Sequence, residues 1–182
     1  MTDETDEPGP SRAEFERVVL PHLEAMARLA RFLLAGNPPD AEDLVQDAVL
    51  RAYTSFPRFE PGTNLRAWLF RILRNTWVDL LRKRGRQGEL ADVEADTEDA
   101  ALEEFRAAAV RARREADLEA ALARLPGEFR LVLLLVDGEE MRYDEVAAVL
   151  ECPVGTVRSR VHRGRRLLRQ HLLELWRRPA SP

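Results

Sequence analysis

The arginines near the C-terminus are spaced so that a helix would gather them on one face. With Val157 as origin and 100° per residue, four residues from Val161 to Leu172 each lie within about 60° of Val157 and form an apolar seam. The seam consists of Val161, Gly164, Leu168 and Leu172, and the other side carries Arg158, Ser159, His162, Arg165, Arg166 and Arg169. At 1.5 Å per residue this polar face is roughly 16 Å long, the reach of a helix laid in a DNA major groove.

A short helical segment, residues 143 to 150, and a turn at Glu151-Cys152-Pro153 precede that basic helix. This order predicts a helix-turn-helix. We expect Arg158, Ser159, His162 and Arg166 to read base edges, and Arg165 and Arg169 mainly to contact phosphates. The charge pattern alone would also fit a solvated, arginine-rich helix, but the short helix and turn in front of it favour DNA reading.

A second polar stripe follows the helix predicted from Asn64 to about Arg84. Its inward side is formed by Leu65, Leu69, Ile72, Leu73, Thr76 and Leu80, and its other side by Arg71, Arg74, Asn75, Val78 and Arg82. Guanidinium groups bind phosphates, and an amide can hydrogen-bond a base, so this stripe also fits nucleic acid. Trp68 and Trp77 flank the seam and are expected in the core.

Helical spacing of apolar residues runs through nearly the whole chain, and no segment alternates as a half-buried strand would. The fold class is therefore expected to be all-α. Helices are predicted at 12–35, with a restart at Pro21, and at 64–84, 143–150 and 154–176. A buried helix is predicted at 128–136. Two more are expected, one that is capped by Asp40 and one that stops before Pro126-Gly127.

Charge divides the chain into parts. Residues 58–86 hold eight cations, residues 156–178 hold another eight, and residues 89–104 hold eight acids and no base. The predicted organisation is a disordered tail at 1–10, a first domain at 11–85, a flexible acidic linker at 86–116 and a second domain at 117–178. Two basic domains on one tether indicate two separate polyanion contacts.

Several function classes are disfavoured by composition. Cys152 is the only cysteine, and with only His22, His162 and His171 besides it no metal-ligand spacing occurs, so we expect no metal and no cofactor. No acid–base or nucleophile constellation stands out, so an enzyme is not expected. No apolar run is long enough to span a membrane, and the acidic start is unlike a secretory signal, which predicts a cytoplasmic protein without membrane insertion.

Three blocks of the sequence resemble the extracytoplasmic-function (ECF) RNA polymerase sigma factors. They are residues 37–47 (NPPDAEDLVQD), 64–75 (NLRAWLFRILRN) and 152–160 (CPVGTVRSR), in the order and spacing of that family. The resemblance covers residues 12 to 175. It implies that the first domain reads and melts the minus-ten promoter element, that the second reads the minus-thirty-five element through its helix-turn-helix, and that the chain has no catalytic activity.

The resemblance also implies partners and residue roles. The helix from Asp40 to Arg51 would grip core RNA polymerase through Glu42, Asp43, Gln46, Asp47, Leu50 and Arg51. The loop from Phe59 to Asn64, with Arg71 and Asn75, would capture a flipped base of the non-template strand. The full minus-ten set is Phe59, Asn64, Arg71, Arg74, Asn75 and Arg82. Promoter DNA, both duplex and melted, is then a partner, and an anti-sigma factor is implied as a regulator.

Two positions depart from the family pattern. Glu140 stands where relatives often have glycine just before the helix-turn-helix, which puts the shape of that turn in question. In the capturing loop, Glu60-Pro61-Gly62 leaves the identity of the captured base open.

Two other function classes fit parts of the pattern. A free-standing helix-turn-helix regulator is disfavoured by the net charge of -4 and by the lack of a dimer face, because a single helix-turn-helix binds duplex DNA weakly. A helical adaptor without a DNA role is disfavoured by the two matched basic stripes.

Overall fold

The structure is a computed structural model that describes residues 12–34, 37–85 and 115–177. Within these ranges all regular elements are helices, which confirms the all-α prediction. The tail predicted at 1–10 lies outside the described residues. So does the predicted linker, apart from residues 115 and 116, which begin a helix.

The N-terminal unit is built from four α-helices and two short 3-10 turns. They are α1 (Arg12–Val19), η1 (Leu20–His22), α2 (Leu23–Leu33), α3 (Pro38–Ser55), η2 (Phe56–Arg58) and α4 (Leu65–Lys83). The predicted restart at Pro21 is confirmed, because η1 interrupts the helix there. A proline in a helix interior removes a hydrogen bond and clashes with the preceding turn.

The predicted start of α3 needs a correction. The helix begins at Pro38, so Asp40 lies inside the first turn and does not occupy the cap position, which belongs to Asn37. Proline is pre-organised for the first turn of a helix, and here it starts the helix earlier than the aspartate suggested. Asp40 instead accepts a hydrogen bond from Asn37 Nδ2 at 2.8 Å. For α4, either Thr63 or Asn64 could cap the helix by its sequence, and the structure gives the cap to Asn64, whose Oδ1 accepts from the Ala67 amide at 3.0 Å.

The core of the N-terminal unit lies between α2, α3 and α4. Met26, Leu29, Leu69, Phe70 and Leu73 are fully buried there. The apolar stripes of these helices therefore meet as their spacing predicts. One end of the unit is closed by an aromatic cluster of Phe15, Tyr53, Phe56, Phe59 and Trp68.

The C-terminal unit contains α6 (Glu115–Ala123), α7 (Gly127–Leu133), a π-helical turn η3 (Leu134–Gly138), α8 (Tyr143–Leu150) and α9 (Val154–Arg177). The buried helix predicted at 128–136 is thus a short α7 that continues as η3. The predicted seam of α9 is buried throughout, and at Gly164 a Cβ atom would lie 3.2 Å from Leu133 Cγ. This close approach brings α9 directly onto α7.

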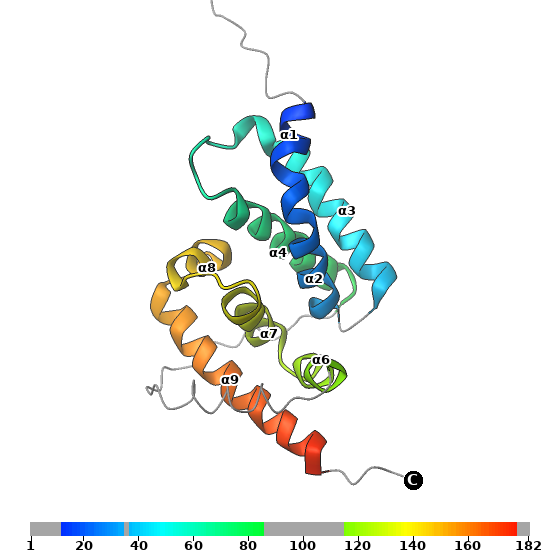
Figure 1. The fold of residues 1–182 in the computed structure, drawn as a ribbon, viewed down its shortest axis with the longest axis vertical. Coiled ribbons are helices and arrows are strands. Elements are labelled where there is room, and N and C mark those ends of the chain that lie inside the picture. The colour runs from blue at the N-terminus through cyan, green and yellow to red at the C-terminus, as the bar shows by residue number, and fades with distance from the viewer. Residues whose placement is uncertain (1–11, 35–36, 86–114, 178–182) are drawn as a thin grey trace, which may run out of the picture.

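The two units pack against each other (Figure 1), with α8 beside α4, and α6 and α7 beside α2. At Gly127 a Cβ atom would lie 2.6 Å from Cη2 of Trp77, so only glycine fits against that buried indole without a shift. Arg130 spans the contact as well. Its guanidinium donates to the carbonyl oxygens of Leu122, Ala123 and Leu125 in its own unit and of Phe32 and Leu33 at the end of α2.

Candidate nucleic-acid interface

The helix α9 runs along the outer edge of the C-terminal unit (Figure 1). Arg158, Arg166 and Arg169 are exposed, and Ser159 and His162 are half-buried beside them. The helix is preceded by α8 and by a turn at residues 151–153, which is the helix-turn-helix order expected from the sequence. Five of the six residues predicted to read the upstream element therefore line one accessible side of α9.

Arg165 is placed differently from the other five. It is only 8% exposed, and its guanidinium donates to both carboxylate oxygens of Asp137, at 2.6 and 3.2 Å. Burial acts to lower the pKa of Arg165, but the hydrogen bond and charge of Asp137 outweigh it, so the pKa is raised and the side chain stays charged. Arg165 ties α9 to the π-helical turn, and a phosphate contact from it would have to replace that ion pair.

Two further arginines hold α9 on α7, and sequence reasoning did not assign them. Arg160 lies 3.2 Å from the carboxylate of Glu128, whose side chain is 2% exposed. Arg163 places its guanidinium 5.7 Å from the ring centre of Phe129. The signal for this pairing was Glu128 itself, an acid in a segment whose other residues are apolar apart from Arg130, because buried charges need partners.

The predicted minus-ten residues gather on α4 and at its N-terminus. Arg71, Arg74, Asn75 and Arg82 lie on one side of α4, where Asn75 and Arg82 are exposed and Arg71 and Arg74 are half-buried. Arg74 donates to Oδ1 of Asn75 at 2.8 Å. This hydrogen bond joins the guanidinium predicted to bind phosphate to the amide predicted to bind a base.

The other two predicted minus-ten residues, Phe59 and Asn64, lie in the loop that leads into the N-terminus of α4. Phe59 is half-buried and stacks on Phe56, with ring centres 6.0 Å apart and planes 6° apart. Asn64 is exposed at the N-cap of α4, and its Nδ2 donates across the unit boundary to Glu145 Oε1 at 2.7 Å. Arg74 likewise reaches across, 3.4 Å from Glu151. Sequence reasoning did not anticipate these two acids as neighbours of the stripe.

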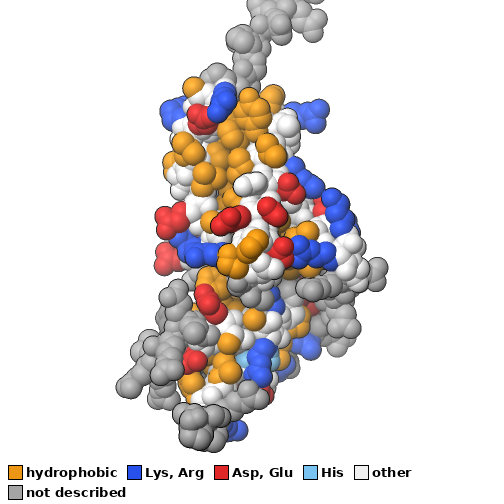
Figure 2. All heavy atoms as spheres, turned by 90° about the vertical axis from the view of Figure 1, so that its right-hand side faces the viewer, with side chains coloured by type: hydrophobic (Ala, Val, Ile, Leu, Met, Phe, Trp, Pro, Cys, Tyr) orange, Lys and Arg blue, Asp and Glu red, His pale blue; other side chains and the backbone are white. Residues whose placement is uncertain are grey.

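The predicted polymerase-binding residues share one exposed face of α3. All six, Glu42, Asp43, Gln46, Asp47, Leu50 and Arg51, are exposed, and Leu50 retains 63% of its surface. On the side of the molecule shown in Figure 2, carboxylates gather next to an apolar area. Such a face suits a partner with both basic and apolar side chains.

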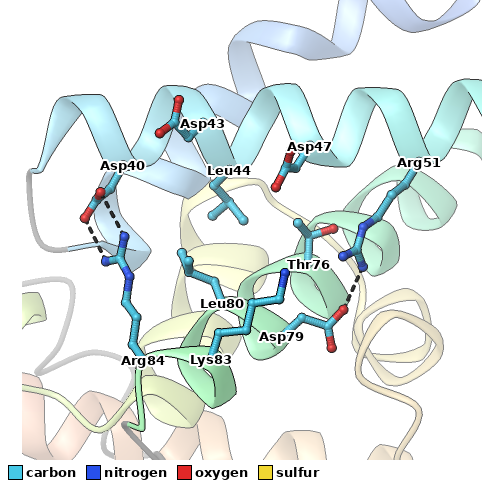
Figure 3. Close-up of a pocket in the computed structure, with 10 residues that line it drawn as sticks. All are labelled: Asp40, Asp43, Leu44, Asp47, Arg51, Thr76, Asp79, Leu80, Lys83 and Arg84. Atoms are coloured by element: carbon cyan, nitrogen blue, oxygen red, sulfur yellow. Dashed lines mark hydrogen bonds and ion pairs between the residues drawn. The ribbon is translucent and has the colours of Figure 1, made fainter.

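A pocket of about 170 Å³ opens between α3 and α4 beside this face (Figure 3). Its two ends are fastened by ion pairs. Arg84 donates to both oxygens of Asp40 at 2.8 and 2.9 Å, and Arg51 donates to Asp79 at 2.7 Å. The hydrogen bond from Arg51 lowers the pKa of Asp79. Asp43 and Asp47 line the pocket between these pairs. The acids predicted to bind a partner therefore lie where two ion pairs hold α3 against the C-terminal half of α4.

Within the described ranges no group of three or more histidine, cysteine, aspartate or glutamate side chains is arranged to hold a metal ion. In the same part of the chain, no helix has the length and apolar character needed to cross a membrane.

Comparison with known families matches both units. The model described as "Sigma-70 region 2" matches residues 18–87, and "Sigma-70, region 4" matches residues 115–168. The chain is 39% identical over 160 residues to the ECF RNA polymerase sigma factor SigE of Mycolicibacterium smegmatis, covering 87% of this chain and 61% of that relative. It is also 39% identical over 155 residues to the ECF RNA polymerase sigma factor EcfG of Rhodopseudomonas palustris, covering 80% of this chain and 76% of that relative.

Two solved structures have the same fold. The sigma factor RpoE of Bartonella quintana, in complex with the anti-sigma factor NepR, superposes with a TM-score of 0.69 at 32% identity and covers 90% of this chain and 98% of that one. CnrH, in complex with the cytosolic domain of CnrY, superposes with a TM-score of 0.64 at 30% identity and covers 91% and 90%.

Proposed function

Because this chain belongs to the family of ECF RNA polymerase sigma factors, we infer that it binds core RNA polymerase and directs it to particular promoters. The observation that carries the inference is the presence of both sigma regions in one chain, each on a separate helical unit with its own basic face. Members of this family are transcription initiation factors and not enzymes. A free-standing operator-binding protein would not need the region-2 unit with its acidic α3 face.

The two units divide promoter recognition between them. The unit at 11–85 corresponds to sigma domain two and reads the minus-ten element through Phe59, Asn64, Arg71, Arg74, Asn75 and Arg82. The unit at 117–178 corresponds to sigma domain four and reads the minus-thirty-five element through the exposed face of α9. The stretch 86–116 between them acts as the tether. This assignment is supported by the exposed Arg158 and Arg166 on α9 and by the position of Asn75 on α4.

Control by an anti-sigma factor belongs to the same proposal. The two solved structures compared above are complexes, RpoE with the anti-sigma factor NepR and CnrH with the cytosolic domain of CnrY. We expect this chain to be held in the cytoplasm by a partner of that kind. The acidic α3 face serves core polymerase, through Glu42, Asp43, Gln46, Asp47, Leu50 and Arg51.

Run-off transcription tests the function directly. Core polymerase with the purified chain should transcribe from a subset of candidate promoters on which core polymerase alone is silent. A gel shift of duplex promoter DNA should require core polymerase. A strong shift by the chain alone, with no transcription in the presence of core polymerase, would favour a free-standing regulator instead.

The melting role of α4 has its own test. Asn75→Ala and Arg71→Ala should leave polymerase binding intact but reduce opening of the duplex, because these side chains meet unpaired DNA. Permanganate reactivity of the open region should fall on duplex promoters and recover on a template with a pre-melted bubble. Equal defects on both templates would point to a folding or docking fault.

A further inference from the structure

One edge of the C-terminal unit presents three glutamates to the N-terminal unit. Glu139, only 7% exposed, lies 3.0 Å from Arg28 and 2.6 Å from Arg66. The other two stand at either end of α8. Their partners are Asn64 for Glu145, at 2.7 Å, and Arg74 for Glu151, at 3.4 Å. We call Glu139, Glu145 and Glu151 the acidic edge.

The acidic edge contacts residues that the proposed function assigns to DNA binding, Asn64 and Arg74. The side-chain amide of Asn64 is engaged on both atoms, since its Oδ1 accepts from the Ala67 amide and its Nδ2 donates to Glu145. A base that binds Asn64 therefore competes with Glu145 for this amide. A phosphate at Arg74 must in the same way compete with Glu151, because carboxylate and phosphate oxygens accept the same charge-assisted hydrogen bonds.

The acidic edge reaches toward one DNA-binding surface and leaves the other accessible. On α9, Arg158, Arg166 and Arg169 are exposed, and α9 runs along the far side of α8 from α4 (Figure 1). The described contacts between the units involve α2 and α4 on one side and α6, α7, η3 and α8 on the other. When the two units are packed together, an arrangement we call closed, the acidic edge therefore covers part of the proposed minus-ten surface. The proposed minus-thirty-five surface stays uncovered.

The backbone at Glu151 shows that this acid holds an unusual position. It ends α8 with φ of 54°, a left-handed conformation in which glycine is strongly preferred. A non-glycine residue in this conformation is strained. The carboxylate that extends from this turn lies 3.4 Å from Arg74.

We propose that the acidic edge is an internal competitor for single-stranded DNA. The N-terminal unit binds either the acidic edge or the melted strand at Asn64 and Arg74, so the units must part when the minus-ten strand is captured. Duplex DNA at α9 does not require this separation. The proposal rests on the proposed function, because it takes the minus-ten role of Asn64 and Arg74 as its premise.

Gly127 offers a way to open the units without touching any proposed DNA-binding residue. A Cβ atom at Gly127 would lie 2.6 Å from the buried Trp77 ring of the opposite unit, so Gly127→Ala should force the units apart. Gly138→Ala is the matched control, because a Cβ atom at Gly138 has no neighbour within 4 Å. Glu139→Gln is an independent second variant that weakens the ion pairs with Arg28 and Arg66 and leaves the glycine in place.

Trp77 also reports the opening. In a background with Trp68→Phe and Trp176→Phe, the remaining indole is 6% exposed in the closed form. Opening should shift its emission to longer wavelength. Binding of DNA is followed in parallel, by anisotropy of a dye-labelled 12-nucleotide single strand of random sequence and of a duplex of the same length. The full chain is used throughout.

If the open fraction rises from ~10% to ~90%, apparent affinity for the single strand rises about ninefold, since only the open form binds. We expect Gly127→Ala and Glu139→Gln to show red-shifted emission and single-strand binding tighter by about threefold to tenfold. Gly138→Ala should match the parent chain. Adding the single strand to the parent chain should produce the same emission shift, and adding the duplex should not.

The outcomes separate the inference from its premise. Red-shifted variants that bind the single strand no more tightly than the parent chain would overturn the inference and leave the sigma-factor function standing. Emission that stays unchanged in both variants would overturn it too, since the interface would not depend on these contacts. No single-strand binding by any form, open or closed, together with no promoter opening in transcription assays, would refute the minus-ten assignment itself.

Discussion

Glu140 is a non-glycine residue in a backbone conformation that favours glycine. The sequence raised the question of whether the turn before α8 differs, because relatives often have glycine there. The structure gives Glu140 a φ of 52°, so the turn keeps the left-handed conformation that glycine would adopt. The residue type could be read from the sequence, but the strain could not, because φ is set by the turn that links η3 to α8.

Replacing Glu140 by glycine should therefore raise the free energy of unfolding. Relief of the left-handed strain outweighs the extra freedom that glycine gives the unfolded chain, for a net gain of about 0.5 to 1 kcal/mol. Ala148→Gly, at an exposed position inside α8, is the control and should lower stability by about 1 kcal/mol. Urea unfolding measures both. A loss of stability in Glu140→Gly would mean that the glutamate side chain contributes more than the strain costs.

The exposed arginines of α9 are expected to divide into two kinds. Arg158→Ala should cost ~1 to 3 kcal/mol in binding to the preferred upstream element and relax its specificity, as for a base-contacting arginine. Arg169→Ala should weaken binding to all sequences alike, because a phosphate contact carries no sequence information. Competition binding of holoenzyme to promoters with substituted upstream elements distinguishes the two. An unchanged preference in Arg158→Ala would contradict the base-reading role.

At the scale of elements, helical periodicity predicted most of the fold. The seam of α9 was found correctly because Val157, Val161 and Leu168 recur at the helical period and are buried. Two details escaped this reasoning. The start of α3 at Pro38 depends on cap geometry, and the π-helical turn after α7 depends on how Leu134 and Leu135 pack, which no local pattern reveals.

The α3 face yields a prediction about the polymerase. Reversing two of its exposed charges, with Asp43→Arg and Asp47→Arg together, should abolish association with core polymerase, because charge complementarity controls such docking. The free energy of unfolding should change by less than about 1 kcal/mol, since exposed charges contribute little to stability. The matched control is Asp117→Arg with Glu119→Arg on α6. A pull-down measures association, and normal transcription by the α3 variant would rule out this docking face.

For the whole molecule, the sequence predicted two helical units but not how they meet. Sequence reasoning assigned no partner to the acids at 139, 145 and 151, and it placed Trp77 in the core. Only the structure shows that Trp77 faces Gly127 and that Glu145 faces Asn64. Contacts between residues fifty or more positions apart are set by three-dimensional packing, and neither local charge nor local spacing along the chain predicts them.

The tether between the units leads to a prediction from distance. Residues 86–116 number 31, and deleting residues 89–104 leaves 15. Fifteen residues span at most ~50 Å, and the two promoter elements lie roughly 50 to 70 Å apart. The deletion should block two-element promoters but spare polymerase binding, as run-off transcription and pull-down would show. Replacing the acids of 89–104 by serine and glycine keeps the length and should preserve promoter choice, whereas full activity of the deletion would show that the tether does not set the spacing.

Arg130 would keep most of its hydrogen bonds if the two units separated. Burial lowers its pKa, yet its guanidinium makes most of its hydrogen bonds inside the C-terminal unit, to the carbonyls of Leu122, Ala123 and Leu125. Only Phe32 and Leu33 belong to the other unit. On separation the Arg130 charge therefore keeps three acceptors, and the carbonyls of Phe32 and Leu33 at the end of α2 must be rehydrated. We expect the units to part and rejoin as preformed bodies, at a rate governed by water entering the contact and without any refolding step.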